Sequence, residues 1–275
     1  MTRKCITAWS ALVLASVAGS LHAEEEGSTA TGFVNFSFSV DGTERTAGLY
    51  VPPDYDSSEE WPLIVFLHGG GGNGSNNGNA LTERFYRQGL VRTIQNYPER
   101  FPALVAFPRC PEDKIWSPVP ADPVQSDWRL GVHGREPAPD AETHVTAVID
   151  GIIADYAVDE DRVVITGYSM GGEGSIRYAA LHPERIAAVA SAAGSAVIVP
   201  EDAPVLARMG VWLFQGETDH LSTAPLARRM VAAIRASGGN PLYTEYAGVG
   251  HGMANRVYED AEVIAWMLDQ RRGPE

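Results

Sequence analysis

Lysine is almost absent from this sequence, and acidic residues outnumber basic ones. Only Lys4 and Lys114 occur, and 35 Asp and Glu against 21 Lys and Arg give a formal net charge of -14 at pH 7. Such a surface repels phosphate backbones, and no basic run exceeds pairs such as Arg271-Arg272. We therefore expect no nucleic-acid partner. Chemistry that needs a reactive lysine is also disfavoured, because Lys114 lies in a Pro-rich loop.

Cysteine is scarce as well, with only Cys5 and Cys110. Residues 1–23 have the pattern of a secretory signal peptide, in which Arg3 and Lys4 precede an apolar stretch and Ala23 ends a cleavage site. The apolar stretch is shorter than the roughly 20 residues that a membrane span needs. We therefore predict cleavage and a secreted or periplasmic protein with no membrane span. Cys110 would then remain alone, which excludes an internal disulfide.

The remaining residues, 24–275, have the features of one domain. Apolar residues make up 44% and charged residues 20% of the sequence, close to globular averages, and neither a repeat nor a linker interrupts it. Single α/β domains commonly reach this length.

Short β-rich runs alternate with helical patterns along this domain. The first two runs, 33–40 and 47–51, flank the turn Asp41-Gly42 and predict an antiparallel hairpin. Further strands are predicted at 63–67, 103–107, 163–166, 187–190, 211–214 and 242–246, and helices at 81–95, 141–156, 171–181, 225–236 and 254–270. Strands that alternate with crossover helices specify a mostly parallel central sheet with helices on both faces. The predicted fold class is therefore α/β.

One long segment, residues 108–140, breaks the regular spacing. It is rich in proline, poor in helical pattern and carries Trp116 and Trp128. A long structureless segment inside a compact domain is usually functional or mobile. Because it follows the strand 103–107, it leaves the sheet where ligands bind in open α/β folds. We therefore predict that it forms a wall of the substrate pocket, with Trp116 and Trp128 as substrate-binding residues.

A serine motif follows the predicted strand 163–166. The segment Gly167-Tyr168-Ser169-Met170-Gly171 matches G-x-S-x-G and leads directly into a helical pattern. In this context the glycines let the backbone pack around a strained serine, whose hydroxyl is presented at the helix N-terminus. The context predicts that Ser169 is a nucleophile. The alternative is that the glycines only make a tight turn.

A serine hydroxyl needs a histidine base, which an acidic residue must orient. Asp219 follows the strand 211–214 and His251 follows the last predicted strand, so the chain order is the Ser, Asp, His expected of an α/β-hydrolase. Asp202 precedes its strand and lies at the wrong edge, while Glu217 is a rival acid. His220 is the rival base, but its adjacency to Asp219 points the two side chains apart. The predicted catalytic residues are Ser169, Asp219 and His251.

The glycine run that begins after His68 has a function if Ser169 is a nucleophile. Acyl transfer builds an oxyanion that needs preorganised N–H donors, each worth roughly 3 kcal/mol. The Met170 N–H should be one donor, and the second should come from the glycine run, with Gly70 as first choice and Gly71 as the alternative. A phosphate loop at 69–79 is the rival interpretation, but it lacks the Gly-Lys-Ser/Thr ending. His68 is expected to brace this loop.

The other histidines do not indicate a metal site. His133 and His144 have no metal-ligand spacing with any carboxylate or cysteine, and His182 before Pro183 fits a common helix-end role. We therefore expect neither a metal ion nor another cofactor.

Taken together, these motifs resemble the α/β-hydrolase esterases of the phospholipase/carboxylesterase and dienelactone-hydrolase-like group, including secreted esterases related to prolyl oligopeptidase. The resemblance spans roughly residues 61–272 and rests on 62–69, 108–111 with Trp116, 167–172, 211–219 and 243–251. It implies a serine hydrolase that acts on carboxylic esters.

The sequence departs from this group at several points. The strand that usually ends in His-Gly ends here in Gln215-Gly216, and Gly252 follows the histidine in place of Asp or a larger residue. Dienelactone hydrolases proper use a cysteine nucleophile where this chain has Ser169. True prolyl oligopeptidases carry a propeller domain too large for 275 residues, so peptidase activity is not implied.

The leading hypothesis is a serine esterase that forms an acyl-enzyme on Ser169 and acts on a small-molecule ester. An alternative within the same fold is a polysaccharide-linked acetyl or feruloyl esterase, in which Trp116 and Trp128 stack on sugar or aromatic rings. An alternative of another class is a non-catalytic binding protein with a hydrolase fold. The intact set of Ser, Asp and His disfavours that alternative.

Overall fold

The computed structural model describes residues 30–70, 89–111, 115–116, 140–194 and 200–273. The chain divides into two compact units, Met1–Ala30 and Thr31–Glu275, and the second contains every element below. The predicted signal peptide, Gly71 and Trp128 lie outside the described residues.

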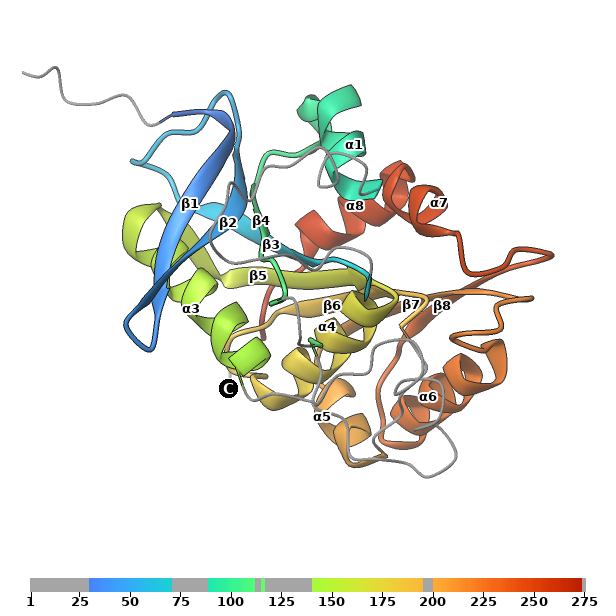
Figure 1. Cartoon of the computed structure of the whole chain (residues 1–275). Coiled ribbons are helices and arrows are strands. Elements are labelled where there is room, and N and C mark those ends of the chain that lie inside the picture. The colour runs from blue at the N-terminus through green and yellow to red at the C-terminus, as the bar shows by residue number, and fades with distance from the viewer. Residues whose placement is uncertain (1–29, 71–88, 112–114, 117–139, 195–199, 274–275) are drawn as a thin grey trace, which may run out of the picture. The chain divides into compact units, whose positions relative to one another are not determined.

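An eight-stranded sheet forms the centre of the second unit (Figure 1), in the order β1-β2-β4-β3-β5-β6-β7-β8. β2 pairs antiparallel with β1 and with β4, and every other neighbouring pair is parallel. This topology confirms the predicted α/β fold with an antiparallel N-terminal hairpin. The strands are β1 Gly32–Val40, β2 Thr43–Val51, β3 Trp61–Leu67, β4 Leu104–Phe107, β5 Val158–Tyr168, β6 Ala188–Ala192, β7 Gly210–Gly216 and β8 Leu242–Tyr246.

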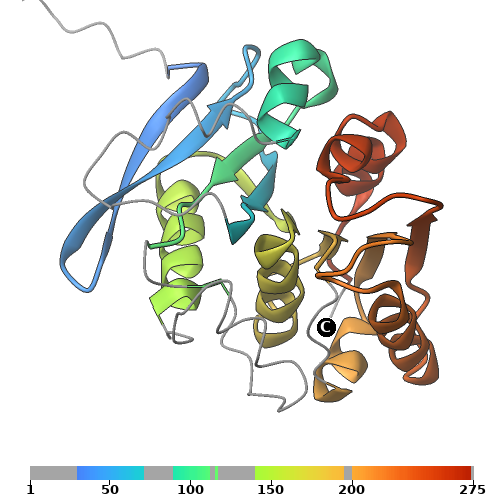
Figure 2. The same ribbon diagram turned by 45° about the vertical axis from the view of Figure 1, so that its right-hand side comes forward.

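Helices cover both faces of the sheet (Figures 1 and 2). Successive side chains of β3 point to opposite faces and pack against different helices. Leu63, Val65 and Leu67 pack into one apolar cluster with α3, α4, α5 and α6. Ile64 and Phe66 pack into the other with α1, α7 and α8. The helices are α1 Gly89–Asn96, α3 Asp140–Asp155, α4 Met170–Leu181, α5 Ala203–Leu206, α6 Ala224–Ala236, α7 Ala254–Tyr258 and α8 Ala261–Asp269, with 3₁₀ turns η3 Pro98–Arg100 and η4 Pro200–Asp202.

The continuous apolar sequence of β3 follows from this two-sided cover. All seven of its residues are buried, as expected for a parallel strand with helices on both faces. Because β3, β5, β6, β7 and β8 run in the same direction, their carboxyl ends meet at one edge of the sheet. Residues that directly follow β5, β7 and β8 therefore come together there.

Two elements differ from the sequence-based prediction. The helix predicted at 254–270 is divided into α7 and α8, and β5 begins at Val158, five residues before the predicted start. Of the predicted helix 81–95, the structure describes only the part from Gly89 onward. The other predicted strands and helices coincide with observed ones to within a few residues.

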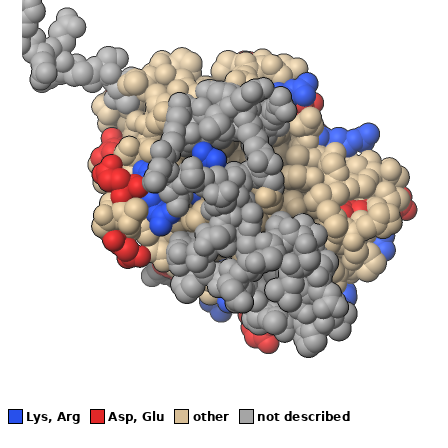
Figure 3. All heavy atoms as spheres, viewed as in Figure 1, with Lys and Arg blue, Asp and Glu red and all other residues tan. Residues whose placement is uncertain are grey.

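The charged groups of the described surface are dispersed. On the face shown in Figure 3, the described Arg side chains form small separate groups. Several of the described arginines pair with carboxylates. For example, Arg272 donates to Asp161 at 2.7 Å, and Arg271 donates to Asp159 at 2.5 Å. No helix in the described ranges combines the length and apolarity needed to cross a membrane.

Candidate active site

Ser169 occupies a strained turn between β5 and α4. Its φ of 56° and ψ of -120° place a residue with a side chain in the region that favours glycine. The Ser169 N–H donates to the Ala192 carbonyl at 2.8 Å, and the Glu173 N–H donates to the Ser169 carbonyl at 3.0 Å. Both backbone groups are therefore held by neighbouring elements, which keep the turn in its strained form.

The glycines around Ser169 are required by close backbone approach. A Cβ on Gly167 would lie 2.2 Å from the Gly171 carbonyl oxygen, and one on Gly171 would lie 1.9 Å from the Leu67 carbonyl oxygen. No side chain fits at these distances. The G-x-S-x-G pattern thus reflects the packing of the turn against the end of β3.

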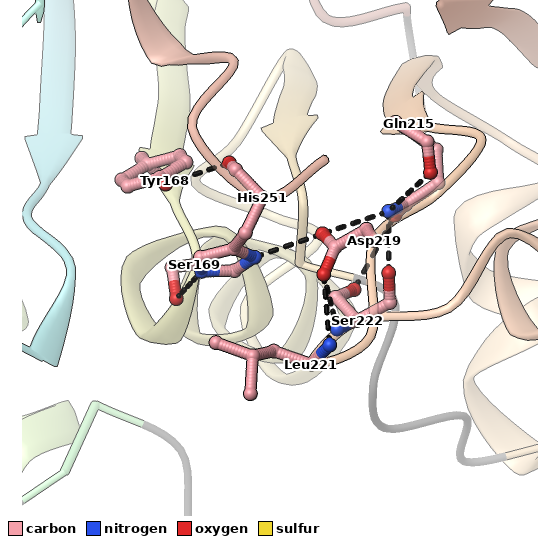
Figure 4. A network of polar contacts seen from close by, with 8 residues as sticks. Tyr168, Ser169, Gln215, Asp219, Leu221, Ser222 and His251 are labelled. Atoms are coloured by element: carbon pink, nitrogen blue, oxygen red, sulfur yellow. Dashed lines mark hydrogen bonds and ion pairs between the residues drawn. The ribbon is translucent and has the colours of Figure 1, made fainter. Parts of the chain in front are cut away.

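The structure brings the three predicted catalytic side chains together (Figure 4). His251 Nε2 lies 2.8 Å from Ser169 Oγ, and His251 Nδ1 lies 2.8 Å from Asp219 Oδ2. Because an ionised carboxylate only accepts hydrogen bonds, Nδ1 carries the proton of the neutral ring. The lone pair of Nε2 then faces the serine hydroxyl, which is the tautomer that a general base requires.

Asp219 is buried but has hydrogen-bond donors on both carboxylate oxygens. Its side chain is 0% exposed. Oδ1 accepts from the backbone N–H groups of Leu221 and Ser222 at 2.8 and 3.1 Å, and Oδ2 accepts from His251 and from Gln215 Nε2 at 3.1 Å. Burial alone would raise the pKa of Asp219, but the hydrogen bonds from His251 and the two backbone groups outweigh it and lower that pKa. The carboxylate is thus stabilised in its charged form.

Tyr168 contacts the histidine from the other side. Its hydroxyl donates to the His251 carbonyl at 2.7 Å, and the two ring centroids lie 5.3 Å apart. Burial, together with the nearby charge of Asp219, raises the pKa of Tyr168 to about 12, so the phenol stays a donor. Sequence reasoning assigned no role to Tyr168, although its place inside the G-x-S-x-G segment puts it next to the serine.

The rival acids and the rival base lie elsewhere. Glu217 accepts from the Gly248 N–H at 2.7 Å and so fastens the loop that carries His251. Asp202 pairs with Arg177 at 2.5 Å. His220 is exposed at the surface.

Of the two predicted oxyanion-hole residues, Met170 directly follows Ser169, and Gly70 lies in the loop after β3. Met170 is the first residue of α4, a position whose N–H has no acceptor within the helix. The loop after β3 passes close by, because a Cβ on Gly69 would lie 3.2 Å from the Tyr168 ring and 3.5 Å from Ser169 Cβ. Gly70 follows directly in this loop.

His68 braces the same loop, as expected. Its Nδ1 lies 2.8 Å from the Gly69 carbonyl, and its Nε2 accepts from the Cys110 N–H at 3.0 Å. Since Nε2 accepts, the proton of this ring is on Nδ1. His68 therefore ties the end of β3 to the segment after β4.

Trp116 does not fit the predicted substrate-binding role. It is 3% exposed, its indole N–H donates to the His68 carbonyl at 2.9 Å, and its ring lies 5.1 Å from the His68 ring. Trp116 Cβ would also lie 2.3 Å from a Cβ on Gly174 of α4. A large apolar ring packs here because glycine leaves room for it, so Trp116 belongs to the core instead of an open pocket wall.

No metal site is evident within the parts of the chain that the structure describes. There, no group of three or more His, Cys, Asp or Glu residues is arranged to hold an ion.

Comparison with known proteins assigns the chain to a family. The Dienelactone hydrolase family matches residues 125–267, just over half of the chain. The chain belongs to the dienelactone hydrolase family. At the position predicted for the nucleophile, this family member carries Ser169.

The relatives of this dienelactone hydrolase family member include esterases. NocK from Nocardia uniformis subsp. tsuyamanensis, named as an esterase, is 29% identical over 194 residues, which cover 68% of this chain and 50% of NocK. The crystal structure of a thermostable esterase is 28% identical, with a TM-score of 0.71 over 87% of this chain and 63% of that chain. The family member thus spans half of NocK and less than two thirds of the thermostable esterase.

A ferulic acid esterase structure also shares the fold. It is 15% identical, with a TM-score of 0.58 over 86% of this chain and 98% of that chain. At this identity the likeness concerns the fold alone.

Proposed function

We propose that the protein is a serine esterase that hydrolyses carboxylic esters through an acyl-enzyme on Ser169. The observation that carries this proposal is the continuous hydrogen-bonded series from Ser169 Oγ through His251 to Asp219, with 2.8 Å at each step. This geometry supports nucleophilic catalysis because each group is within reach of the next. The esterases among its relatives add support.

In the proposed reaction, His251 Nε2 takes the hydroxyl proton while Ser169 Oγ attacks the ester carbonyl carbon. The tetrahedral intermediate collapses as His251 returns that proton to the alcohol oxygen, which leaves. Water then attacks the acyl-serine with His251 again as the base, and the carboxylic acid departs as serine regains its proton. Asp219 orients His251 and stabilises its charged form in both halves.

The oxyanion of both intermediates would be stabilised by backbone N–H groups. We propose Met170 and Gly70 as donors, because one begins α4 and the other follows Gly69 beside Ser169. Such donors contribute most when they are fixed before the charge develops. The strained turn and the loop braced by His68 provide that rigidity.

The central test is removal of the nucleophile. We expect Ser169→Ala to lower kcat/KM for nitrophenyl esters by at least roughly three orders of magnitude, since the residual rate comes only from binding and the oxyanion hole. The variant should stay folded and lose all labelling by a fluorophosphonate probe. Ser237→Ala, which alters an exposed serine that bonds to its own helix, is the matched control.

Two outcomes would contradict the proposal. Folded Ser169→Ala with near wild-type turnover would place the nucleophile elsewhere. A wild-type protein that neither turns over esters nor reacts with the probe would favour the non-catalytic binding protein.

The polysaccharide-linked acetyl or feruloyl esterase is the narrower alternative. The core position of Trp116 removes one of its two supposed stacking residues, and Trp128 lies outside the described residues. Rates on nitrophenyl acetate, acetylated xylan and methyl ferulate separate the candidates. We also propose that the protein acts after export, given its predicted signal peptide.

A further inference from the structure

Gln215 is the last residue but one of strand β7, and it contacts the acid of the site. It is 0% exposed, and its Nε2 donates to Asp219 Oδ2 at 3.1 Å and to the Ser222 carbonyl. Its Oε1 accepts from the Ser222 hydroxyl at 3.3 Å. Both ends of the amide are thus bonded to the loop that carries Asp219 (Figure 4).

The amide contacts the same carboxylate oxygen that His251 uses. Oδ1 is held by backbone groups of the loop itself, at Leu221 and Ser222. Oδ2 has Gln215 as its donor from the rigid strand and His251 as its donor from the site. A residue of the strand therefore acts together with the loop in setting the direction in which Oδ2 points.

The chemistry of the amide suits this position. A buried carboxylate is destabilised unless donors surround it, and an amide offers a donor that does not titrate. The titratable groups that face Asp219 among the described contacts are His251 and Tyr168. Gln215 adds a donor without adding a charge, whatever the protonation state of His251.

We propose that Gln215 is a positioning residue that aims Asp219 Oδ2 at His251 Nδ1 and keeps that carboxylate ionised while the imidazole gains and loses its proton. The proposal rests on the esterase function proposed above. It predicts that Gln215 affects kcat and its pH dependence, with little effect on KM, because Gln215 does not reach the serine.

Two substitutions at Gln215 test this role. Gln215→Met keeps the length of the side chain and removes the donor, and we expect kcat to fall about 10- to 100-fold, the range for a lost hydrogen bond to a buried charge. KM should stay within about twofold. Gln270→Met, which removes an amide that bonds to the Trp266 carbonyl of α8, is the control.

Gln215→Glu supplies a pH-dependent readout. While the introduced carboxyl group is protonated, its O–H can replace the amide donor, so activity should persist. Once that group ionises, it repels the carboxylate of Asp219 and the donor is lost, so activity should fall at alkaline pH where the wild type stays level.

All rates are referred to the concentration of probe-reactive serine, which removes the contribution of misfolded protein. If both variants keep the wild-type kcat and pH profile, the positioning role is overturned while the esterase proposal stands. If Gln215→Met yields too little reactive protein, the pH profile of Gln215→Glu alone decides whether Gln215 has the positioning role. Failure of wild type to react with probe and esters would instead overturn the esterase proposal itself.

Discussion

Asp219 and His144 are two buried titratable side chains with opposite surroundings. Four donors surround the carboxylate of Asp219, so that it stays charged. Within the described parts of the chain, neither ring nitrogen of His144 has a hydrogen-bond partner, and its ring packs edge-on against Phe38 at 4.8 Å. The first arrangement suits a group that must hold a charge, and the second suits a group that stays neutral.

Tyr168 provides a prediction at the scale of one residue. Tyr168→Phe removes the hydrogen bond to the His251 carbonyl and keeps the ring contact. A typical hydrogen bond contributes about 1 kcal/mol, so we expect kcat to fall about fivefold with KM unchanged. The measurement is steady-state kinetics referred to probe-reactive serine.

Tyr178→Phe is the matched control, because that hydroxyl bonds to Thr146 away from the serine. It should lower thermal stability at most and leave kcat unchanged. Equal loss of kcat in both variants would mean that Tyr168 acts through general stability only.

The three catalytic candidates could be predicted from sequence, and their supporting residues could not. Ser169 lies in a motif with its own strand and helix context, and Asp219 and His251 each follow a recognisable strand. In the sequence, Gln215 stood out only because the strand ends in Gln215-Gly216 where the similar esterases usually have His-Gly. The Tyr168 contact joins residues 83 positions apart, and no local pattern encodes it.

Among the secondary-structure elements, β5 and the α7–α8 pair show where local patterns fail. The first residues of β5 include Asp159 and Asp161, whose charges hide the strand in sequence but pair with Arg271 and Arg272 in the structure. The break after α7 comes where Asp260 caps α8 by accepting from the Glu262 N–H. An apolar period that continues across both helices conceals this cap.

Trp116 gives a prediction about how elements are held together. Its ring links the end of β3, through His68, to helix α4 at Gly174. Trp116→Ala should therefore lower the free energy of unfolding by about 3–5 kcal/mol. Trp116→Phe, which loses the indole hydrogen bond and part of the ring but stays aromatic, should cost less than Trp116→Ala.

Urea unfolding and the rates on several nitrophenyl esters distinguish this role from substrate binding. We expect the ranking of the esters to be the same in both Trp116 variants as in the wild type. An altered ranking at unchanged stability would return Trp116 to the pocket wall.

The stability of the whole molecule in acid depends in part on His144. The ring is 1% exposed, and burial, followed by the charges of Arg45 and His68, lowers the pKa of His144 to about 3. In the unfolded chain a histidine titrates near about 6.5. Between these values the unfolded state binds a proton that the folded state does not, so stability falls as pH drops below about 6.5.

Replacing His144 should remove this part of the acid sensitivity. Because of His144, the free energy of unfolding falls by about 1.4 kcal/mol for each pH unit between the two pKa values. We expect the free energy of unfolding of His144→Leu to decline less steeply from about pH 6.5 to about pH 4 than that of the wild type. The control is His220→Leu, at an exposed histidine, which should follow the wild type. Parallel curves for wild type and His144→Leu would contradict the assignment.

The left-handed backbone at Ser169 also has an evolutionary consequence. A β-branched side chain is a severe outlier at positive φ, so threonine is barred from this turn although it carries a hydroxyl. Cysteine differs from serine in one atom and places the same demands on the backbone. A lineage with this turn can therefore exchange oxygen for sulfur at this position through ancestors that all keep their fold.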